Sequence, residues 1–263
     1  MPEPSESAPI LVALAGGVLD IRLNRPDKKN AITGAMYTAM AEALERADAD
    51  PAIQAVLFSG AGDSFTAGND LKDFLANPPG TGDSPVWRFL KAITTARKVL
   101  IAAVHGSAVG IGTTMLLHCD LVYAGQSAKF ALPFVKLGLV PEAGSSLLLP
   151  RLAGHQRAAE LLLLGEPFDA ATAYELGLAN RVVDDAALLP TARAAAAAIA
   201  ALPSDAVQQS KRLLKRNAAS LADCMEEEGR IFGAQLRSAE FREAATAFLE
   251  KRPPDFAALR KGG

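Results

Sequence analysis

Two glycine-rich stretches carry most of the fold information in this chain: Phe58-Ser-Gly-Ala-Gly-Asp-Ser-Phe-Thr-Ala-Gly-Asn-Asp-Leu71 and Val104-His-Gly-Ser-Ala-Val-Gly-Ile-Gly-Thr-Thr114. Each follows a short apolar run typical of a buried strand, Ala55–Ser59 or Val99–Val104, and each leads into a helical pattern. Glycine lets the main chain approach a ligand closely, and the first residues of a helix carry main-chain N–H groups without partners. Two such turns that meet at one point would form an oxyanion hole, in which two N–H groups hold a developing negative charge.

The spacing of the glycines argues against two common kinds of site. Gly106, Gly110 and Gly112 follow a G-x-x-x-G-x-G pattern, whereas a dinucleotide loop needs G-x-G-x-x-G, and no phosphate-binding G-x-x-x-x-G-K-[ST] occurs. The step around Ser107 lacks the leading glycine of a G-x-S-x-G nucleophile elbow, which disfavours a serine hydrolase. The alternative to an oxyanion hole is that the glycines only serve tight strand-to-helix turns.

Strand and helix patterns alternate on both sides of these turns. Ile10–Ala15 and Val18–Leu23 predict a hairpin, and Thr33 predicts the start of a helix that runs to about Ala47. Apolar strands separated by helices predict an α/β fold with a sheet covered by helices. Further strands are expected at Leu121–Ala124 and Arg181–Val183, and further helices at Leu71–Leu75, Val86–Arg97 and Thr113–Leu117.

From His155 onward the pattern is almost wholly helical. Asp169 predicts the start of a helix that ends near Gly177, and an alanine-rich helix ends near Leu202. We place a boundary near residue 200, with a core over 1–200 and a C-terminal helical region over 201–263. In that region helices are expected at Ser204–Arg216, Leu221–Leu236 and Ser238–Glu250.

Composition narrows the class of protein. The 263 residues hold 27 Lys and Arg against 29 Asp and Glu, and half of them are hydrophobic, which excludes a disordered chain and disfavours a nucleic-acid partner. The longest apolar run, Ala194–Leu202, is far shorter than the about 20 residues of a membrane span, so we expect no membrane partner. The 2 cysteines and 3 histidines show no disulfide or metal spacing. MPEPSESAPI at the start lacks the features of a signal peptide, and we expect a cytoplasmic protein without a metal.

Several motifs in order resemble the crotonase (enoyl-CoA hydratase/isomerase) superfamily. They are Asn24-Arg-Pro-Asp-Lys-Lys-Asn-Ala31, the segments Ser64–Leu71 and His105–Gly112, Cys119-Asp120, and Leu137-Gly-Leu-Val-Pro141. The resemblance implies a spiral core of ββα units with a C-terminal helical trimerisation region. It also implies trimers or dimers of trimers, and an acyl-CoA thioester substrate without a separate cofactor.

The resemblance also implies roles for individual residues. The main-chain N–H groups of Asn69 and Ile111 would hold the thioester oxygen of an enolate. Asp70 is expected to cap the following helix rather than to take part in the chemistry. Further contacts with CoA or substrate are implied for Lys28, Ala67, Asn69, Asp70, Leu71, Lys72, Ile111 and Lys251.

The departures from the family pattern point to one branch. Hydratases of the superfamily carry two glutamates, and here Thr114 and Phe134 stand at those positions. Glu142, within Leu137-Gly-Leu-Val-Pro-Glu-Ala-Gly-Ser-Ser146, resembles the base of the Δ3,Δ2-enoyl-CoA isomerase branch, and Ile111 in place of a glycine fits that branch as well. Apolar neighbours would raise the pKa of the Glu142 carboxyl and make it a better base. Four residues could supply that setting: Leu132, Phe134, Leu139 and Val140.

The leading hypothesis is therefore an isomerase that moves a 3-enoyl-CoA double bond to give trans-2-enoyl-CoA through a dienolate. A hydratase or another crotonase-type acyl-CoA enzyme is one alternative, and a non-catalytic acyl-CoA-binding scaffold is another. If Glu142 has no role in catalysis, it is a solvated loop carboxylate or an acid at the start of a helix. Cys119, between His118 and Asp120, is expected to be a packing residue. Phe232 and Phe248 either line an acyl tunnel or form core or trimer contacts.

Overall fold

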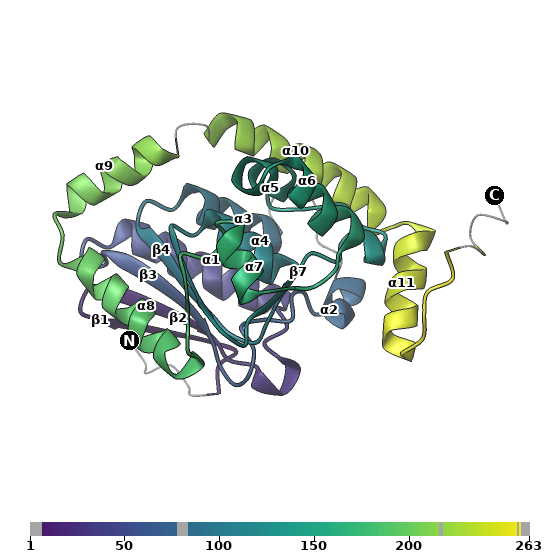
Figure 1. Cartoon of the computed structure of the whole chain (residues 1–263), viewed down its shortest axis with the longest axis horizontal. Coiled ribbons are helices and arrows are strands. Elements are labelled where there is room, and N and C mark those ends of the chain that lie inside the picture. The colour runs from purple at the N-terminus through teal and green to yellow at the C-terminus, as the bar shows by residue number, and fades with distance from the viewer. Residues whose placement is uncertain (1–6, 78–83, 216–217, 257, 259–263) are drawn as a thin grey trace.

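The computed structural model describes residues 7–77, 84–215, 218–256 and 258, and a six-stranded sheet organises the first part of the chain (Figure 1). β1 (Ile10–Ala15) and β2 (Val18–Leu23) form the predicted antiparallel hairpin. The next strands all run parallel, in the order β1-β2-β3-β4-β6-β9. They are β3 (Ala55–Gly60), β4 (Val99–Val104), β6 (Leu121–Gly125) and β9 (Arg181–Val183).

Helices cover both faces of this sheet, which explains why β3 and β4 are buried at every position. α8 (Asp185–Ala200) packs on one face, where Leu57 and Ile101 point. α1 (Gly34–Ala49) and α3 (Pro85–Thr95) pack together on the other face, where Phe58 and Leu100 point. The α/β class predicted from alternating apolar strands and helices is confirmed.

A second, three-stranded sheet was not predicted. It consists of β5 (Ser107–Val109), β7 (Lys129–Ala131) and β8 (Phe168–Asp169), in the order β5-β7-β8. β5 lies inside the second glycine-rich stretch, so that stretch forms a short strand before α4 (Ile111–Thr114) begins. Strands of two or three residues give only a weak sequence pattern, and among the described strands of this length only β9, which has two consecutive valines, was predicted.

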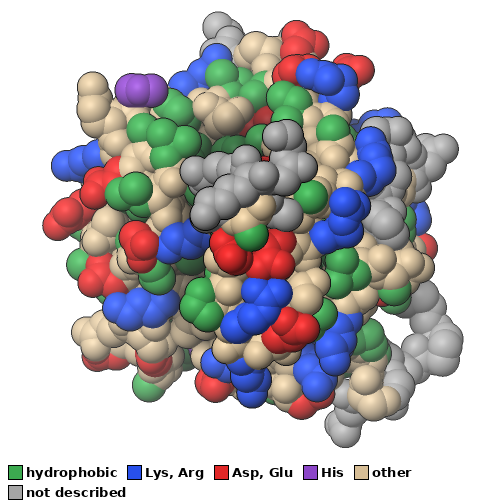
Figure 2. Space-filling view, turned by 90° about the vertical axis from the view of Figure 1, so that its right-hand side faces the viewer, with side chains coloured by type: hydrophobic (Ala, Val, Ile, Leu, Met, Phe, Trp, Pro, Cys, Tyr) green, Lys and Arg blue, Asp and Glu red, His purple; other side chains and the backbone are tan. Residues whose placement is uncertain are grey.

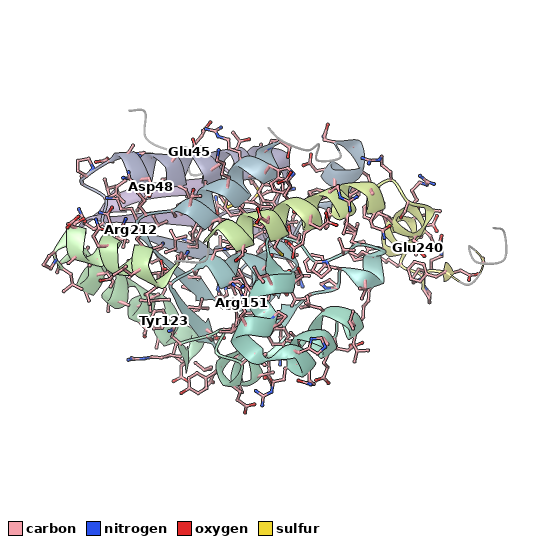
Figure 3. The ribbon with its side chains drawn as sticks, turned by 90° about the horizontal axis from the view of Figure 1, so that it is seen from above. Glu45, Asp48, Tyr123, Arg151, Arg212 and Glu240 are labelled. Atoms are coloured by element: carbon pink, nitrogen blue, oxygen red, sulfur yellow. The ribbon has the colours of Figure 1, made fainter. Side chains whose placement is uncertain are left out.

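Most helix boundaries agree with the sequence to within two residues, although the helix expected from Leu221 begins at Ala218. Two smaller differences show what ends or begins a helix. The helix expected over Val86–Arg97 ends at Thr95, and the N–H of Arg97 instead donates to a carboxylate oxygen of Asp48 on α1 at 2.9 Å (Asp48 is labelled in Figure 3). The helix expected from Thr113 begins two residues earlier, as α4, and tightens into the 3-10 turn η2 (Met115–His118). Thr33 and Asp169 cap the starts of α1 and α7, as predicted, since each side chain accepts a main-chain N–H.

The remaining helices form the outer layer of the molecule (Figure 1). α10 (Ala218–Gln235) packs against α5 (Ser145–Ala153), and α11 (Ala239–Glu250) packs against the turn η3 (Val135–Leu137). The other turns and helices are η1 (Pro26–Lys28), α2 (Leu71–Ala76), α6 (His155–Ala159), the π-helical turn η4 (Glu160–Leu164), α7 (Ala170–Glu175) and α9 (Ser204–Leu214). The expected helix end at Arg216 and most of the N-terminal lead lie outside the described residues.

The described helices were also compared with the requirements for crossing a membrane. None of them alone is long and apolar enough, and only α8 and α9 meet the length and composition together, as a pair bent by 109°.

Candidate active site

The two glycine-rich turns lie against each other. Thr66 pairs with the β5 strand, since its N–H donates to the carbonyl of Ser107 at 2.9 Å and its carbonyl accepts from Val109 at 3.1 Å. A Cβ atom at Gly68, where φ is +86°, would lie 2.6 Å from the Val109 carbonyl oxygen, and one at Gly112 would lie 2.5 Å from the Thr66 Cγ2. Such distances are sterically forbidden, so glycine is required at both positions for the turns to meet.

This contact brings the main chains of Asn69 and Ile111 to the same part of the molecule. Ile32 pairs with Asn69 through bonds from its N–H to Gly68 and from the Asp70 N–H to its carbonyl, so the N–H of Asn69 points away from Ile32. Ile111 is the first residue of α4, and its N–H has no partner inside the helix. Neither N–H has an acceptor among the described residues. Both are therefore available for a ligand.

The side chain of Asn69 has a separate function in the packing. Its Oδ1 accepts a 2.5 Å hydrogen bond from the hydroxyl of Tyr37 on α1, and the Tyr37 ring lies 5.4 Å from the Phe89 ring on α3. Burial and the nearby Glu142 carboxyl raise the pKa of Tyr37 well above its usual value, so the phenol keeps its proton. The Tyr37 hydroxyl therefore holds the residue whose N–H would bind the thioester oxygen.

Glu142 is buried beside these turns, with 7% of its surface exposed. The Thr114 hydroxyl donates a 2.7 Å hydrogen bond to its Oε1. Burial raises the pKa of Glu142 to about 7, against the lowering effect of the Thr114 bond and with a smaller contribution from the charge of Glu228. The burial of Glu142 is inconsistent with the alternative that it is a solvated loop carboxylate. Thr114, which the sequence marked only as a missing glutamate, is its hydrogen-bond partner.

The turn that carries Glu142 is fixed by contacts from two other elements, η2 and α10. Ala143 and Gly144 both adopt left-handed conformations, with φ of 59° and 71°. Burial lowers the pKa of His118 on η2 to about 4, so its neutral Nε2–H donates to the Ala143 carbonyl at 2.7 Å. Glu228, on α10, accepts from the N–H groups of Gly144 and Ser146. Sequence patterns gave no sign of the contacts made by His118 and Glu228.

An apolar cavity opens next to Glu142. With its opening to solvent it measures about 510 Å³. Among the described residues that line it, only Glu142 is ionisable. The others come from α2, α3, the Glu142 turn and α10: Phe74, Val86, Trp87, Leu90, Ala143, Met225, Gly229, Phe232 and Gly233.

The apolar surroundings of the Glu142 turn extend beyond the cavity. Leu132, Phe134 and Leu139, expected to supply an apolar setting, are buried in the core that includes Ala143, and Val140 packs against it. The cavity itself is lined by helices distant in the sequence and by none of these four residues. Phe232 does line it, whereas Phe248 is 64% exposed on α11. Gly229 is required because a Cβ there would lie 2.0 Å from the Trp87 ring, while a Cβ at Gly233 would enter open space.

The lysines proposed for CoA lie at the surface on separate elements. Lys28 ends η1 and Lys72 lies in the first turn of α2, and both are exposed. These elements are joined by the pair between Arg25 and Asp70, 3.2 Å apart. Lys251 ends α11 in a left-handed conformation. Figure 2, which shows the molecule from the right-hand side of Figure 1, has basic side chains interspersed with acidic ones.

Four other residues singled out from the sequence have clear positions in the structure: Ala67, Asp70, Leu71 and Cys119. Asp70 caps α2, as expected, by accepting from the N–H groups of Lys72 and Asp73. Ala67 and Leu71, on either side of Asn69 and Asp70, are half-buried next to the same turn. Burial and Asp120 raise the pKa of Cys119 to about 12, and its Sγ lies 3.7 Å from the Met115 carbonyl, which agrees with a packing role.

Comparison with known proteins identifies the family. The sequence profile of the family described as enoyl-CoA hydratase/isomerase matches residues 14–259. This chain belongs to that family. The predicted resemblance to the crotonase superfamily is thereby confirmed.

Individual relatives of the enoyl-CoA hydratase/isomerase family align over nearly the whole chain. A 1,2-epoxyphenylacetyl-CoA isomerase from Escherichia coli is 38% identical over 94% of this chain and 97% of its own. Enoyl-CoA delta isomerase 2 from Rattus norvegicus is 36% identical over 94% of this chain and 65% of its own. Several further relatives are named enoyl-CoA hydratases.

A solved structure confirms the predicted crotonase-type fold. The enoyl-CoA hydratase/isomerase from Pseudoalteromonas atlantica is 46% identical and superposes with a TM-score of 0.91, covering 95% of this chain and 100% of its own. The chain is accordingly a crotonase-type acyl-CoA enzyme.

Proposed function

We propose that this enzyme is a 3-enoyl-CoA isomerase, which moves the double bond of a 3-enoyl-CoA to give trans-2-enoyl-CoA. One observation carries the proposal: Glu142 is the only ionisable residue among the described residues that line the apolar cavity. A double-bond shift needs one group that removes and returns a proton, and a pKa near neutrality suits that group. The name of the rat relative, an enoyl-CoA delta isomerase, supports the same reaction.

The reaction needs only this base and the two turns. Glu142 removes a proton from C2, and the electrons of that C–H bond move into the C1–C2 bond while the thioester carbonyl becomes a dienolate oxygen. The N–H groups of Asn69 and Ile111 stabilise that oxygen, and a single donor of this kind typically contributes about 10²–10³ in rate. Protonated Glu142 then returns the proton at C4, and the double bond forms between C2 and C3.

Hydration is the nearest alternative, and the site argues against it. Adding water calls for one group that activates water and another that delivers a proton, whereas Thr114 and Phe134 stand at the two glutamate positions. Glu228 is a second carboxylate near Glu142, but its oxygens accept hydrogen bonds from Gly144 and Ser146 and it does not line the cavity. A non-catalytic scaffold would have no need of a buried base.

The substrate and assembly are part of the proposal. We place CoA near the exposed Lys28 and Lys72, with Ala67, Asp70 and Leu71 beside the thioester and Lys251 as a further contact. We place the acyl group in the apolar cavity. Exposed apolar side chains on the outer helices, such as Phe248 and Leu214, support association of several copies of the chain, and we propose a homotrimer or a dimer of trimers. The proposed setting is fatty-acid or related acyl-CoA metabolism in the cytoplasm, with no separate cofactor.

The decisive experiment compares two substrates on the purified protein and on Glu142→Gln. We expect turnover of 3-hexenoyl-CoA that is lost in Glu142→Gln and retained in Glu227→Gln, an exposed glutamate paired with Arg230. Rapid hydration of crotonyl-CoA that survives Glu142→Gln would refute the proposal. Tight binding of CoA esters without any turnover would favour the scaffold. Size-exclusion mass, compared with multiples of 27.4 kDa, tests the assembly.

A further inference from the structure

Glu228 is a buried carboxylate with no basic partner among the described residues. It lies on α10 and is 7% exposed. Its Oε2 accepts the N–H of Gly144 at 2.6 Å, and its Oε1 accepts the N–H of Ser146 at 2.9 Å and the Ser146 hydroxyl at 2.5 Å. The thiol of Cys224, one helical turn earlier, lies 3.7 Å from Oε1. Burying a charge is costly unless its oxygens are hydrogen-bonded, and both oxygens of Glu228 accept such bonds from one turn of the chain.

The donors that hold Glu228 belong to the turn after Glu142. Gly144 precedes α5 in a left-handed conformation, and Ser146 lies in the first turn of that helix. The carboxylate therefore occupies the N-terminal end of α5, where main-chain N–H groups and the helix dipole favour a negative charge. The opposite side of the turn is anchored by the Ser145 hydroxyl, which donates to the Glu142 carbonyl at 2.6 Å.

We propose that Glu228 is a positioning residue that fixes the turn after Glu142 and so places the base against the carbons between which it moves a proton. This inference rests on the proposed isomerase function. Glu228 does not line the cavity, so it acts through Glu142 rather than on the substrate. It also makes α10 of the C-terminal region a direct support of the base.

The charge of Glu228 gives the inference a second, electrostatic consequence. Four titratable groups face Glu142 or its turn: Tyr37 from α1, His118 from η2, and Cys224 and Glu228 from α10. Burial keeps the phenol, the imidazole and the thiol neutral near pH 7. Glu228 supplies a negative charge that raises the pKa of Glu142. Removing that charge should therefore make the base less basic, which a purely structural contact would not do.

The test compares Glu228→Gln with Glu227→Gln, which changes the same charge one residue earlier on an exposed face of α10. In Glu228→Gln we expect kcat on 3-hexenoyl-CoA to fall by about 10²-fold with little change in KM, because a small misplacement of a reacting group has that effect. We also expect the acidic limb of the kcat profile to move to lower pH. In Glu228→Asp the charge stays while the reach shortens, so kcat should fall without that movement.

The controls separate failure of this inference from failure of the proposed function. If the wild type isomerises and Glu228→Gln matches Glu227→Gln in kcat and pH profile, the inference is overturned and the function stands. If the wild type does not isomerise, the inference can still be tested by infrared spectroscopy. The protonated-carboxyl band that disappears in Glu142→Gln reports the ionisation of Glu142, and its pH titration is compared between the wild type and Glu228→Gln. An unchanged titration in Glu228→Gln would overturn the inference.

A folding failure would not leave the inference undecided. If Glu228→Gln does not fold, Ser146→Ala removes only the hydroxyl donor and leaves both N–H contacts. A smaller loss of kcat, with KM retained, would then support the inference, and unchanged kinetics would overturn it.

Discussion

Burial dominates the raised pKa of Glu142, and one hydrogen bond of 2.7 Å from Thr114 opposes it. The Thr114 hydroxyl stabilises the carboxylate and so lowers the pKa of Glu142 against the effect of burial. In Thr114→Val we expect the acidic limb of the kcat/KM profile to move to higher pH, because a base must be ionised to accept a proton.

Thr114→Ser keeps the hydroxyl and serves as the control for this prediction. The acidic limb of the Thr114→Ser profile should stay near that of the wild type, at about pH 7. If the acidic limb of Thr114→Val also stayed at that pH, the limb would reflect the titration of a group other than Glu142. The opposite shift expected for Glu228→Gln provides an internal check.

The sequence singled out Glu142, the proposed base, but not the residues that contact it. Glu142 stands out because it lies in a recognisable motif. Glu228 lies 84 positions from Gly144 and is the last of three consecutive glutamates, Glu226 to Glu228. Nothing in such a run shows which member turns inward, because that depends on how α10 packs. The hydrogen bond from Thr114 to Glu142 could not be predicted either, because it also depends on how the two segments pack.

The two glycine turns form a functional pair only if their main chains touch. In Gly68→Ala the new Cβ would lie 2.6 Å from the Val109 carbonyl oxygen, and the positive φ of +86° would be strained as well. We expect this variant to separate the turns and to lower kcat by about 10²–10³-fold, the usual effect of losing one oxyanion donor. Steady-state kinetics with 3-hexenoyl-CoA would measure the loss.

Gly16→Ala is the matched control for strain alone. Gly16 also has a positive φ, of +57°, but nothing lies within 4 Å of the site of its Cβ, in the β1–β2 hairpin. Its kcat should remain that of the wild type. Equal losses in the two variants would attribute the effect to backbone strain instead of to the contact between the turns.

At the element scale, prediction succeeded where local signals were strong. The hairpin, the strands β3 and β4 and the capped helix α1 all lie where apolar runs and capping residues placed them. The three-stranded sheet was missed because its strands are too short to show a period. Apart from Phe232, the walls of the cavity were missed because α2, α3 and α10 meet only through tertiary packing, which sequence spacing does not encode.

Over the whole molecule, an ion pair made by a buried lysine connects α9 to the central sheet. Nζ of Lys211 on α9 lies 2.7 Å from Oδ2 of Asp120, and it also donates to the Lys98 carbonyl at 2.6 Å. Breaking a fully buried pair costs about 3–5 kcal/mol, and the 21% exposure of the Asp120 side chain places this pair at the lower end. We expect Lys211→Met to lower the free energy of unfolding by this order in a denaturant titration.

A second substitution can restore part of that loss. Asp120 also accepts from the N–H of Leu100 at 2.8 Å, which an asparagine at position 120 could still do without a charge. Lys211→Met combined with Asp120→Asn should therefore be more stable than Lys211→Met alone. If the double variant were the less stable, the loss would come from packing of the lysine side chain.

The boundary near residue 200 stays a prediction, and contacts in the structure cross it. Helix α10 lies beyond that boundary, yet it contributes Met225 and Phe232 to the cavity and Glu228 to the turn of the base. The C-terminal helices therefore complete the site, whichever way the chain is divided.

The burial of Glu142 also has a thermodynamic consequence. With a pKa near 7 in the fold and an ordinary value of 4.5 in the unfolded chain, the native protein holds a proton that the unfolded chain releases between those pH values. Folding stability should then decline as pH rises through that interval, by on the order of 3 kcal/mol in all. Melting temperatures should show Glu142→Gln to be more stable than the wild type at pH 8, with the advantage gone near pH 4. The protein would thus be least stable under the conditions in which its base is ready to react.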